Sequence, residues 1–219
     1  MRRLLQSREG SFTLEASLVL PVILTTLLIL LFFCMFLYQR AVLGQVAAVA
    51  AERNAYVWDN SYRKPETGAF EEGSYDPLYW RLSDDGMLQA IFGFDRQNPG
   101  ALLSLPAVGE DGGDALPLRK LNRVGQKVHP GIQGEMTYDN RLLMRKAAVS
   151  LNRFAPLAPL ERVIGDITQD ASSEAYIVDP VEWIRSVNLA GYYGAKFKGS
   201  GGSSMDKQEA GKALALFGK

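Results

Sequence analysis

The sequence predicts an α+β protein with a long N-terminal transmembrane and stem helix, followed by a small antiparallel-sheet domain with short helices. Residues 16–37 form an apolar run without a charge, whereas residues 55–198 have ordinary polarity and mix helical with alternating patterns. At a rise of 1.5 Å per residue, the apolar run would form a helix about 33 Å long. That length is enough to cross the hydrocarbon core of a bilayer.

The composition narrows the classes of function. The chain has 24 basic residues (lysine and arginine) and 24 acidic residues (aspartate and glutamate). It therefore lacks the excess of positive charge that is typical of nucleic-acid-binding proteins. A short basic cluster is expected to be one solvated helix face, and it consists of Arg119, Lys120, Arg123 and Lys127. The single cysteine, Cys34, lies in the apolar run, which excludes an intramolecular disulfide. The domain must therefore rely on its core for stability.

The charges beside the apolar run predict its orientation. Arg2, Arg3 and Arg8 precede the run, with only Glu9 against them. The positive-inside rule therefore places the N-terminus in the cytoplasm and the large C-terminal part outside the membrane.

The residues leave three interpretations of this N-terminal segment. It could be an uncleaved single-pass anchor. It could be a secretory signal peptide cut near Ala48-Val49-Ala50, although the apolar run is longer than the roughly 7–15 residues of a signal-peptide core. It could also be cut on the cytoplasmic side between Gly10 and Ser11, which would leave the apolar helix as the new N-terminus.

Glu15 has a clear role under the third interpretation. A carboxylate in an apolar helix costs about 2.5–3.5 kcal/mol at the bilayer centre and less near the edge. After cleavage, Ser11 would carry a free α-amine, and Glu15 would lie one helical turn beyond it. The carboxylate could pair with that amine or with the amine of a neighbouring subunit. In an uncleaved anchor Glu15 is only tolerated near the interface, so the residues alone leave both interpretations open.

This segment resembles the prepilin-peptidase signature of class III and Flp-type prepilins, in which a glycine precedes a glutamate as Gly10 precedes Glu15. The continuation 15–24, EASLVLPVIL, is similar to TadE-like pseudopilins of tight-adherence pilus systems. Major Flp pilins usually carry tyrosine where this chain has Ala16, and they lack a large domain. Both departures favour a minor pseudopilin. The blocks 138–141 and 178–189 also resemble TadE-like proteins of Gram-positive bacteria.

The resemblance implies how the chain would be processed and assembled. A prepilin peptidase would remove the leader, residues 1–10, and an ATPase-driven platform would extract the helix of residues 11–54 into a bundle with other pilins or pseudopilins. Glu15 would set the axial register, while residues 55–198 would form the extracytoplasmic domain of an adhesive surface pilus. The alternative is a permanently anchored extracytoplasmic interaction domain that uses residues 1–54 only as tether and stalk.

Three further positions in the helix have a physical interpretation. Pro21 lacks an N–H, which a membrane helix tolerates where neighbouring helices or a local kink compensate. Gly44 and Ala48 form a small-xxx-small pair that would let a second helix approach closely. A plain alanine-rich stem explains the same residues equally well.

The rest of the chain is expected to contain short elements. Aromatic residues are frequent in residues 55–85, which are expected to be irregular and to wrap around the core. The patterns predict helices at 87–92, 116–128 and 180–193, a loop at 95–115, strands at 132–138, 142–151, 163–168 and 175–178, a turn at 139–140, an extended connector at 154–160, and a flexible linker and tail at 199–219.

No arrangement of residues indicates catalysis. His129 is the only histidine and lies in a turn, and the acidic pairs Glu71-Glu72 and Asp84-Asp85 are expected to be solvated surface acids. The glycines do not form a phosphate-binding loop. The sequence therefore predicts a protein that is not an enzyme and has no cofactor or metal.

Overall fold

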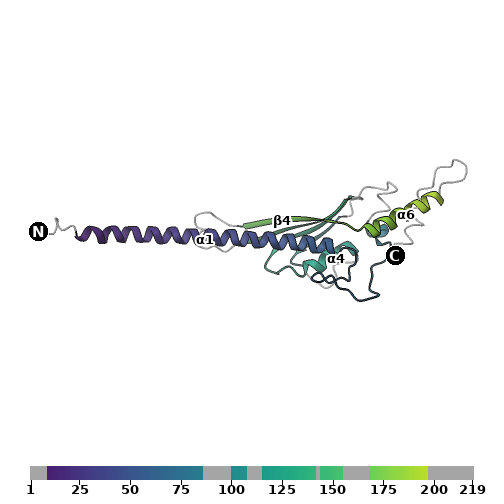
Figure 1. Ribbon diagram of the computed structural model, residues 1–219, viewed down its shortest axis with the longest axis horizontal. Helices are drawn as coiled ribbons and strands as arrows, with labels where there is room; N and C mark the ends of the chain where they lie inside the picture. Colours follow the sequence, from purple (N-terminus) through teal and green to yellow (C-terminus); the bar gives the residue numbers. More distant parts are fainter. Residues whose placement is uncertain (1–8, 86–99, 108–114, 142–143, 155–167, 197–219) are drawn as a thin grey trace. The chain divides into compact units, whose positions relative to one another are not determined.

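The computed structural model describes residues 9–85, 100–107, 115–141, 144–154 and 168–196 (Figure 1). The predicted α+β class, with a long apolar helix before a small antiparallel sheet, is confirmed. The elements in chain order are α1 (Glu9–Tyr56), α2 (Trp80–Ser83), β1 (Ala101–Leu105), α4 (Leu116–Gly125), β2 (Gln133–Arg141), β3 (Met144–Phe154), β4 (Thr168–Ile177) and α6 (Pro180–Lys196).

The chain forms two compact units. The first takes α1 up to Val42 together with residues 154–168, and the second takes residues 43–153 and 169–219. We refer to residues 15–42 as the membrane part of α1 and to residues 43–56 as its stem part. The expected boundaries of leader, helix, domain and tail stay predictions.

The first half of the membrane part of α1 exposes its apolar side chains in every direction. Residues 15–31 are all exposed, whereas Phe32, Phe36 and Val42 are half-buried. Among the described residues, α1 is one helix that is long and apolar enough to cross a membrane. A helix that is apolar all round is suited to lipid, because a water-exposed helix would carry a polar face.

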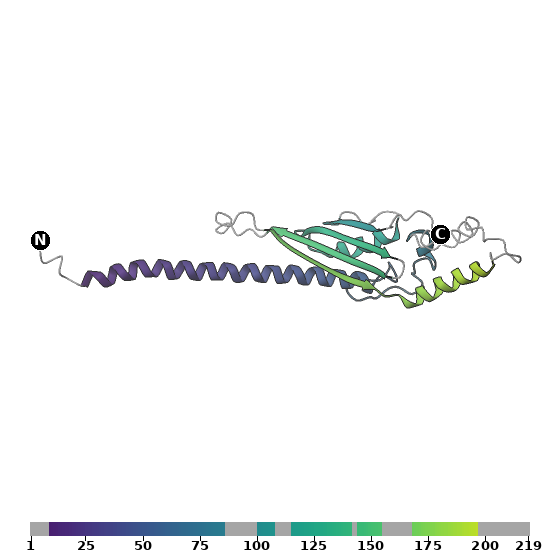
Figure 2. The same ribbon diagram turned by 90° about the horizontal axis from the view of Figure 1, so that it is seen from above.

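The sheet has the order β1-β2-β3-β4 (Figure 2). Strand β1 pairs antiparallel with β2, and β2 pairs antiparallel with β3, so that Leu103 lies opposite Met136 and Tyr138 opposite Ala147. Gly134 has φ of 152°, and a Cβ there would lie 2.1 Å from the carbonyl oxygen of Ser150. Only glycine allows β2 and β3 to approach each other so closely at this point.

One core joins the sheet to the stem part of α1 and to α4. Buried side chains alternate along β2 and β3, as expected for strands with one covered face. They share a cluster with apolar residues of the two helices and of the loop after α1, namely Leu43, Ala47, Ala50, Ala51, Val57, Trp58, Leu116, Leu121 and Val124. The stem part of α1 is thus an integral part of the domain.

The aromatic segment after α1 is partly buried, as expected. Trp58 and Trp80 are buried, and the Trp58 ring stacks on Tyr138 with centroids 4.3 Å apart. Tyr62 and Tyr75 are exposed. The segment therefore contributes its tryptophans to the core and leaves these two tyrosines at the surface.

Two expectations about the strands were wrong. Residues 101–105 form β1 although the region was expected to be a loop. They pair with β2, and the glycine-rich residues on either side of them gave no indication of this pairing. Residues 139–140, expected to be a turn, belong to β2, which continues to Arg141 opposite Met144. Asn140 is buried in the strand and donates a hydrogen bond to the carbonyl of Asp85 at 2.9 Å.

The other expectations about elements were met or lie outside the described residues. Helix α4 ends three residues earlier than expected, α6 begins at Pro180 as expected, and residues 175–177 belong to the longer strand β4. The expected helix at 87–92, the connector beyond residue 154 and the tail lie outside the described residues. So does the strand expected at 163–168, except for Thr168, which is the first residue of β4.

Candidate functional site

The residues expected to be processed and to direct assembly all lie on α1. Gly10 and Ser11 lie in its first turn, and Glu15 follows one turn later, about 6 Å along the axis from Ser11. The side chain of Glu15 is exposed. The helix thus brings the proposed cleavage site and the carboxylate together within two turns, while their roles stay predictions.

Pro21 lies inside the helix, where its ring removes one backbone donor. One turn later, the hydroxyl of Thr25 donates to the carbonyl of Pro21 at 2.6 Å, and that of Thr26 donates to the carbonyl of Val22 at 2.8 Å. Such bonds satisfy a hydroxyl without any water, which suits lipid surroundings. These threonines were not predicted from the sequence. Their position four residues after Pro21 and Val22 could have indicated such hydrogen bonds within the helix.

Gly44 and Ala48 lie beside the face of α1 that packs against the domain. Both are half-buried, whereas Leu43, Ala47 and Ala51 are buried in the core. A Cβ on Gly44 would meet nothing within 4 Å. The domain therefore does not need a glycine at this position, and contact with a second helix at Gly44 and Ala48 stays a prediction.

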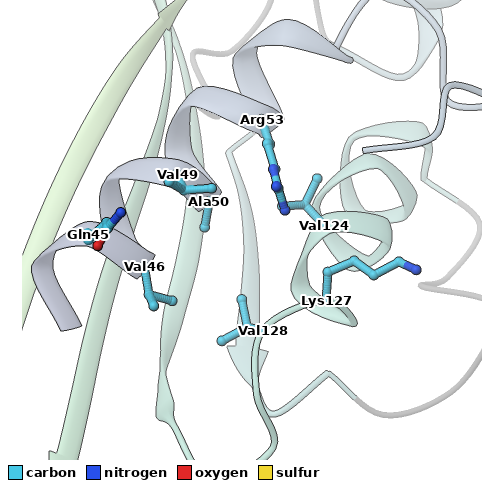
Figure 3. Close-up of a pocket in the computed structure, with 8 residues that line it drawn as sticks. All are labelled: Gln45, Val46, Val49, Ala50, Arg53, Val124, Lys127 and Val128. Atoms are coloured by element: carbon cyan, nitrogen blue, oxygen red, sulfur yellow. The ribbon is translucent and has the colours of Figure 1, made fainter. Parts of the chain in front are cut away.

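A groove of about 250 Å³ runs between the stem part of α1 and α4 (Figure 3). Its apolar lining consists of Val46, Val49, Ala50, Val124 and Val128, and its polar lining of Gln45, Arg53 and Lys127. Lys127 pairs with Glu66 at 2.8 Å, and this pairing lowers the pKa of Glu66. The groove carries no group that is arranged for chemistry.

A buried cluster of charges connects α2, the sheet and α6. The Nε of Arg81 lies 2.9 Å from a carboxylate oxygen of Asp85 and 3.3 Å from one of Glu182. Tyr138 donates its hydroxyl proton to Asp85 at 3.0 Å, and Arg145 lies 3.4 Å from Glu182. Two guanidinium groups thus balance two carboxylates. The expectation that Asp85 is a solvated surface acid was wrong, because Asp85 is buried between nearby Arg81 and Tyr138, which is far away in the sequence.

The electrostatics of this cluster follow from burial. Burial raises the pKa of Asp85 and of Glu182, and the neighbouring arginines only partly offset this effect. Burial alone would lower the pKa of Arg81, but attraction to Glu182 and Asp85 outweighs it and raises that pKa. Burial also raises the pKa of Tyr138. These groups hold one another in place, and none is positioned as a nucleophile beside a base.

Lys120 forms a second buried charged site. Its Nζ lies 2.6 Å from a carboxylate oxygen of Asp76, donates to the carbonyl of Trp58, and lies 4.4 Å from the centroid of the Trp80 ring. Ser61 also donates to Asp76 from both its backbone and its hydroxyl. Burial lowers the pKa of Lys120. The expectation that Lys120 belongs to a solvated basic face was therefore wrong, because its side chain is only 1% exposed.

Both charged sites act as connections between distant segments. Together they attach residues 57–85 to α4, the sheet and α6. In the described part of the chain, no three His, Cys, Asp or Glu side chains lie close enough to hold a metal ion. His129 is exposed, and its Nδ1 accepts a hydrogen bond from the backbone of Gly131 at 3.0 Å.

Comparison with known proteins identifies the N-terminal segment. No curated protein and no solved structure matches the chain. Residues 10–52 match the model of the family described as TadE-like protein. The match covers Glu15, Pro21, Gly44 and Ala48 and begins at Gly10, whereas the Gram-positive type stays a prediction. Residues 10–52 are thus similar to the TadE-like family, and this similarity supports the resemblance to TadE-like proteins of tight-adherence pilus systems.

Proposed function

We propose that the protein is a minor pseudopilin of a tight-adherence-type pilus, which a prepilin peptidase cleaves and which assembles through its N-terminal helix without catalysing a reaction. The observation that carries this proposal is the extent of the family match. The TadE-like segment begins at Gly10 and continues into the stem part of α1, so it includes the candidate cleavage site, the carboxylate and the membrane helix.

In this proposal the N-terminus of the precursor is cytoplasmic and the domain is extracytoplasmic. Cleavage after Gly10 would place a positively charged α-amine on Ser11, one turn from the carboxylate of Glu15. In an apolar bundle, pairing between the two charges would compensate for removing both from water. A pair formed between neighbouring subunits would favour one axial register and disfavour shifted ones.

Packing of the stem supports cleavage at Gly10 over cleavage near Ala50. Leu43, Ala47 and Ala50 belong to the core, and Ala47 is 0% exposed. A cut after Ala50 would remove these three side chains from the domain. Removal of several buried apolar side chains costs several kcal/mol, comparable with the total stability of a small domain. A cut after Gly10 leaves the core intact.

The N-terminal mass of the membrane protein tests the proposal directly. We expect a chain that begins at Ser11 when the protein is purified from cells with an active prepilin peptidase. In a strain without the peptidase, the chain should begin at Met1. An intact Met1 in the active strain would overturn the proposal and favour a permanently anchored interaction domain.

Two substitutions separate cleavage from assembly. Gly10→Phe should block cleavage but leave membrane insertion unchanged, since the peptidase would meet a bulky side chain at the scissile bond. Glu15→Gln should leave cleavage and insertion unchanged but reduce incorporation into pili, because the carboxylate that pairs with the amine is gone. A simple anchor would show no loss of any kind with Glu15→Gln.

A further inference from the structure

Helix α6 follows β4 in the chain (Figures 1 and 2), and it buries polar side chains while exposing apolar ones. Glu182 and Ser186 are buried, whereas Val181, Ile184 and Val187 are 64%, 59% and 46% exposed. The inward orientation of Glu182 follows from its contacts with Arg81 and Arg145 described above. The apolar residues are consequently held on the outer face of the domain.

The exposed residues of α6 follow a seven-residue repeat. Val181, Ile184, Asn188, Gly191 and Ala195 are spaced alternately by three and four residues, which is the spacing of the a and d positions of a coiled coil, and all five are exposed. Val187 and Tyr192 then occupy g and e positions, beside this seam. The buried Glu182 and Ser186 occupy the b and f positions on the opposite side. The repeat therefore separates the inner and outer faces of the helix.

The exposed apolar area is close to what a specific dimer needs. Tyr192 is 62% exposed on α6, and Leu78, which lines the same surface hollow as Val181, is also 62% exposed. Val178, just before α6, is 81% exposed. At roughly 80–100 Å² for each of these six large side chains, one copy presents on the order of 500 Å². Two such faces together reach the roughly 1,000 Å² that marks the lower limit of specific interfaces.

We propose that this face, formed by the a, d, e and g positions of α6 together with Leu78 and Val178 next to them, binds the same face of a second copy of the chain in a parallel, in-register pair. Each a and d residue meets its own counterpart across a two-fold axis. Between Val181 and Tyr192 the seam and its flanks carry one charged residue, Arg185, at an e position whose g partner is the uncharged Pro180.

The pattern favours the second copy in three ways. In parallel pairs a g residue contacts the e residue five positions later on the partner, so Val187 of one copy meets Tyr192 of the other. Asn188 lies at an a position, where an asparagine pair favours a parallel dimer in one register, because each amide both donates and accepts. Gly191 has nothing within 4 Å of a Cβ, so the two backbones can approach closely there.

The pair is expected to be weak in solution and stronger in a membrane. A 17-residue helix with a small seam gives a modest interface, but the domain already holds α6 in place through its inner face. Copies anchored in one membrane also share one orientation, and confinement raises their effective concentration.

Cysteine cross-linking of the full chain in its membrane tests the proposal. The native Cys34 is first replaced in a Cys34→Ser background, and Asn188→Cys is then oxidised with copper phenanthroline. Cysteines at facing a positions lie close enough for a disulfide. We expect a disulfide-linked homodimer at least about tenfold more abundant than with Leu102→Cys, a control at an equally exposed apolar side chain of β1 (58% exposed).

A second variant separates a specific face from random collision. Ile184→Glu in the Asn188→Cys chain should reduce the homodimer at least about tenfold, because two buried carboxylates would face each other across the seam. The near-ultraviolet circular dichroism of the Trp58–Tyr138 stack should stay unchanged, which confirms folding. Glu15→Gln should leave the homodimer unchanged, so this result is separate from the pilin proposal.

Three outcomes would overturn the inference. Asn188→Cys and Leu102→Cys could cross-link equally, Ile184→Glu could leave the homodimer unchanged, or the cross-linked product could have the mass of a complex with a different protein. The last outcome would assign the face to another partner. A chain that stays monomeric because its own tail covers the face would give the first outcome.

Discussion

The membrane part of α1 and the domain that begins at Leu43 treat polar and apolar side chains in opposite ways. The membrane part exposes leucines all round, and its threonine hydroxyls bond to the backbone of their own helix. The domain buries Arg81, Asp85 and Lys120 beside its tryptophans. The hydroxyls of the membrane part bond to the backbone one turn away, whereas Lys120 and Asp85 in the domain also contact groups that are far away in the sequence.

This difference shows what each region demands of its sequence. A helix in lipid has no water to satisfy its polar groups, so nearly every side chain must be apolar and any partner must lie one turn away. A domain in water can bury charges where the fold supplies opposite charges and donors. The same helix, α1, crosses from the first situation to the second near Leu43.

The largest effect is expected from breaking the buried charge cluster. Arg81→Met would leave Asp85 and Glu182 with Arg145 as their remaining cation, at a cost of about 3–5 kcal/mol in the free energy of unfolding. Urea unfolding of the full chain in detergent, followed by Trp fluorescence, measures the loss. Lys146→Met is the control, because the Lys146–Glu174 pair is exposed and its loss should change stability little. Equal stability of the two variants would contradict this account.

A charge in the membrane part tests the opposite environment. Leu28→Arg would place a guanidinium in the middle of the apolar run, at a cost of about 2.5–3.5 kcal/mol for membrane insertion. The fraction of chain that resists alkaline extraction from membranes should fall. Leu102→Arg, at an exposed site of the domain, should leave that fraction unchanged. If Leu28→Arg remained fully membrane-bound, the membrane assignment of this part would be wrong.

The pH dependence of stability tests the burial of Lys120. Because burial lowers its pKa below 10.5 in the folded chain, the unfolded chain binds more protons between the folded-state pKa and 10.5. The stability of the wild-type chain should therefore rise relative to Lys120→Met as the pH approaches 10.5, by at most about 1.4 kcal/mol per pH unit. Urea unfolding of both proteins between pH 8 and pH 10 measures this difference. A falling difference would mean that Asp76 holds the proton on Lys120 instead.

The smallest effect is expected at Gly44, where the two regions meet. Gly44→Ala should stabilise the domain by up to about 1 kcal/mol, since alanine favours the helix and its Cβ meets nothing within 4 Å. The melting temperature of the purified chain measures this gain. If Gly44→Ala raised the melting temperature but reduced incorporation into pili, a second helix would have to pack at Gly44. A lower melting temperature would contradict the described packing.

Local patterns were sufficient for several elements. The apolar run, the helices at α4 and α6 and the β2–β3 pair follow from periodicity within one segment, and these elements were predicted. The candidate assembly residues from Gly10 to Ala48 were also accessible to sequence reasoning, because one helix carries them all. Their spacing on α1 follows directly from helical geometry.

Other features required contacts between distant segments. Residues 101–105 become a strand through pairing with β2, and residues 139–140 belong to β2, where Asn140 donates a hydrogen bond to the carbonyl of Asp85. Lys120 was expected in solvent because helical periodicity says nothing about a carboxylate 44 positions earlier in the sequence, at Asp76. In each case the decisive partner lies outside the local pattern.

The sequence by itself therefore determined that a membrane helix with a glycine, a carboxylate and a proline near its start leads into a small α+β domain. Only the tertiary structure decided which charges are buried and which face of α6 is exposed. The physical reason is the range of the interactions. Hydrophobic periodicity is read within a few residues, whereas the desolvation of a charge depends on every segment that packs around it.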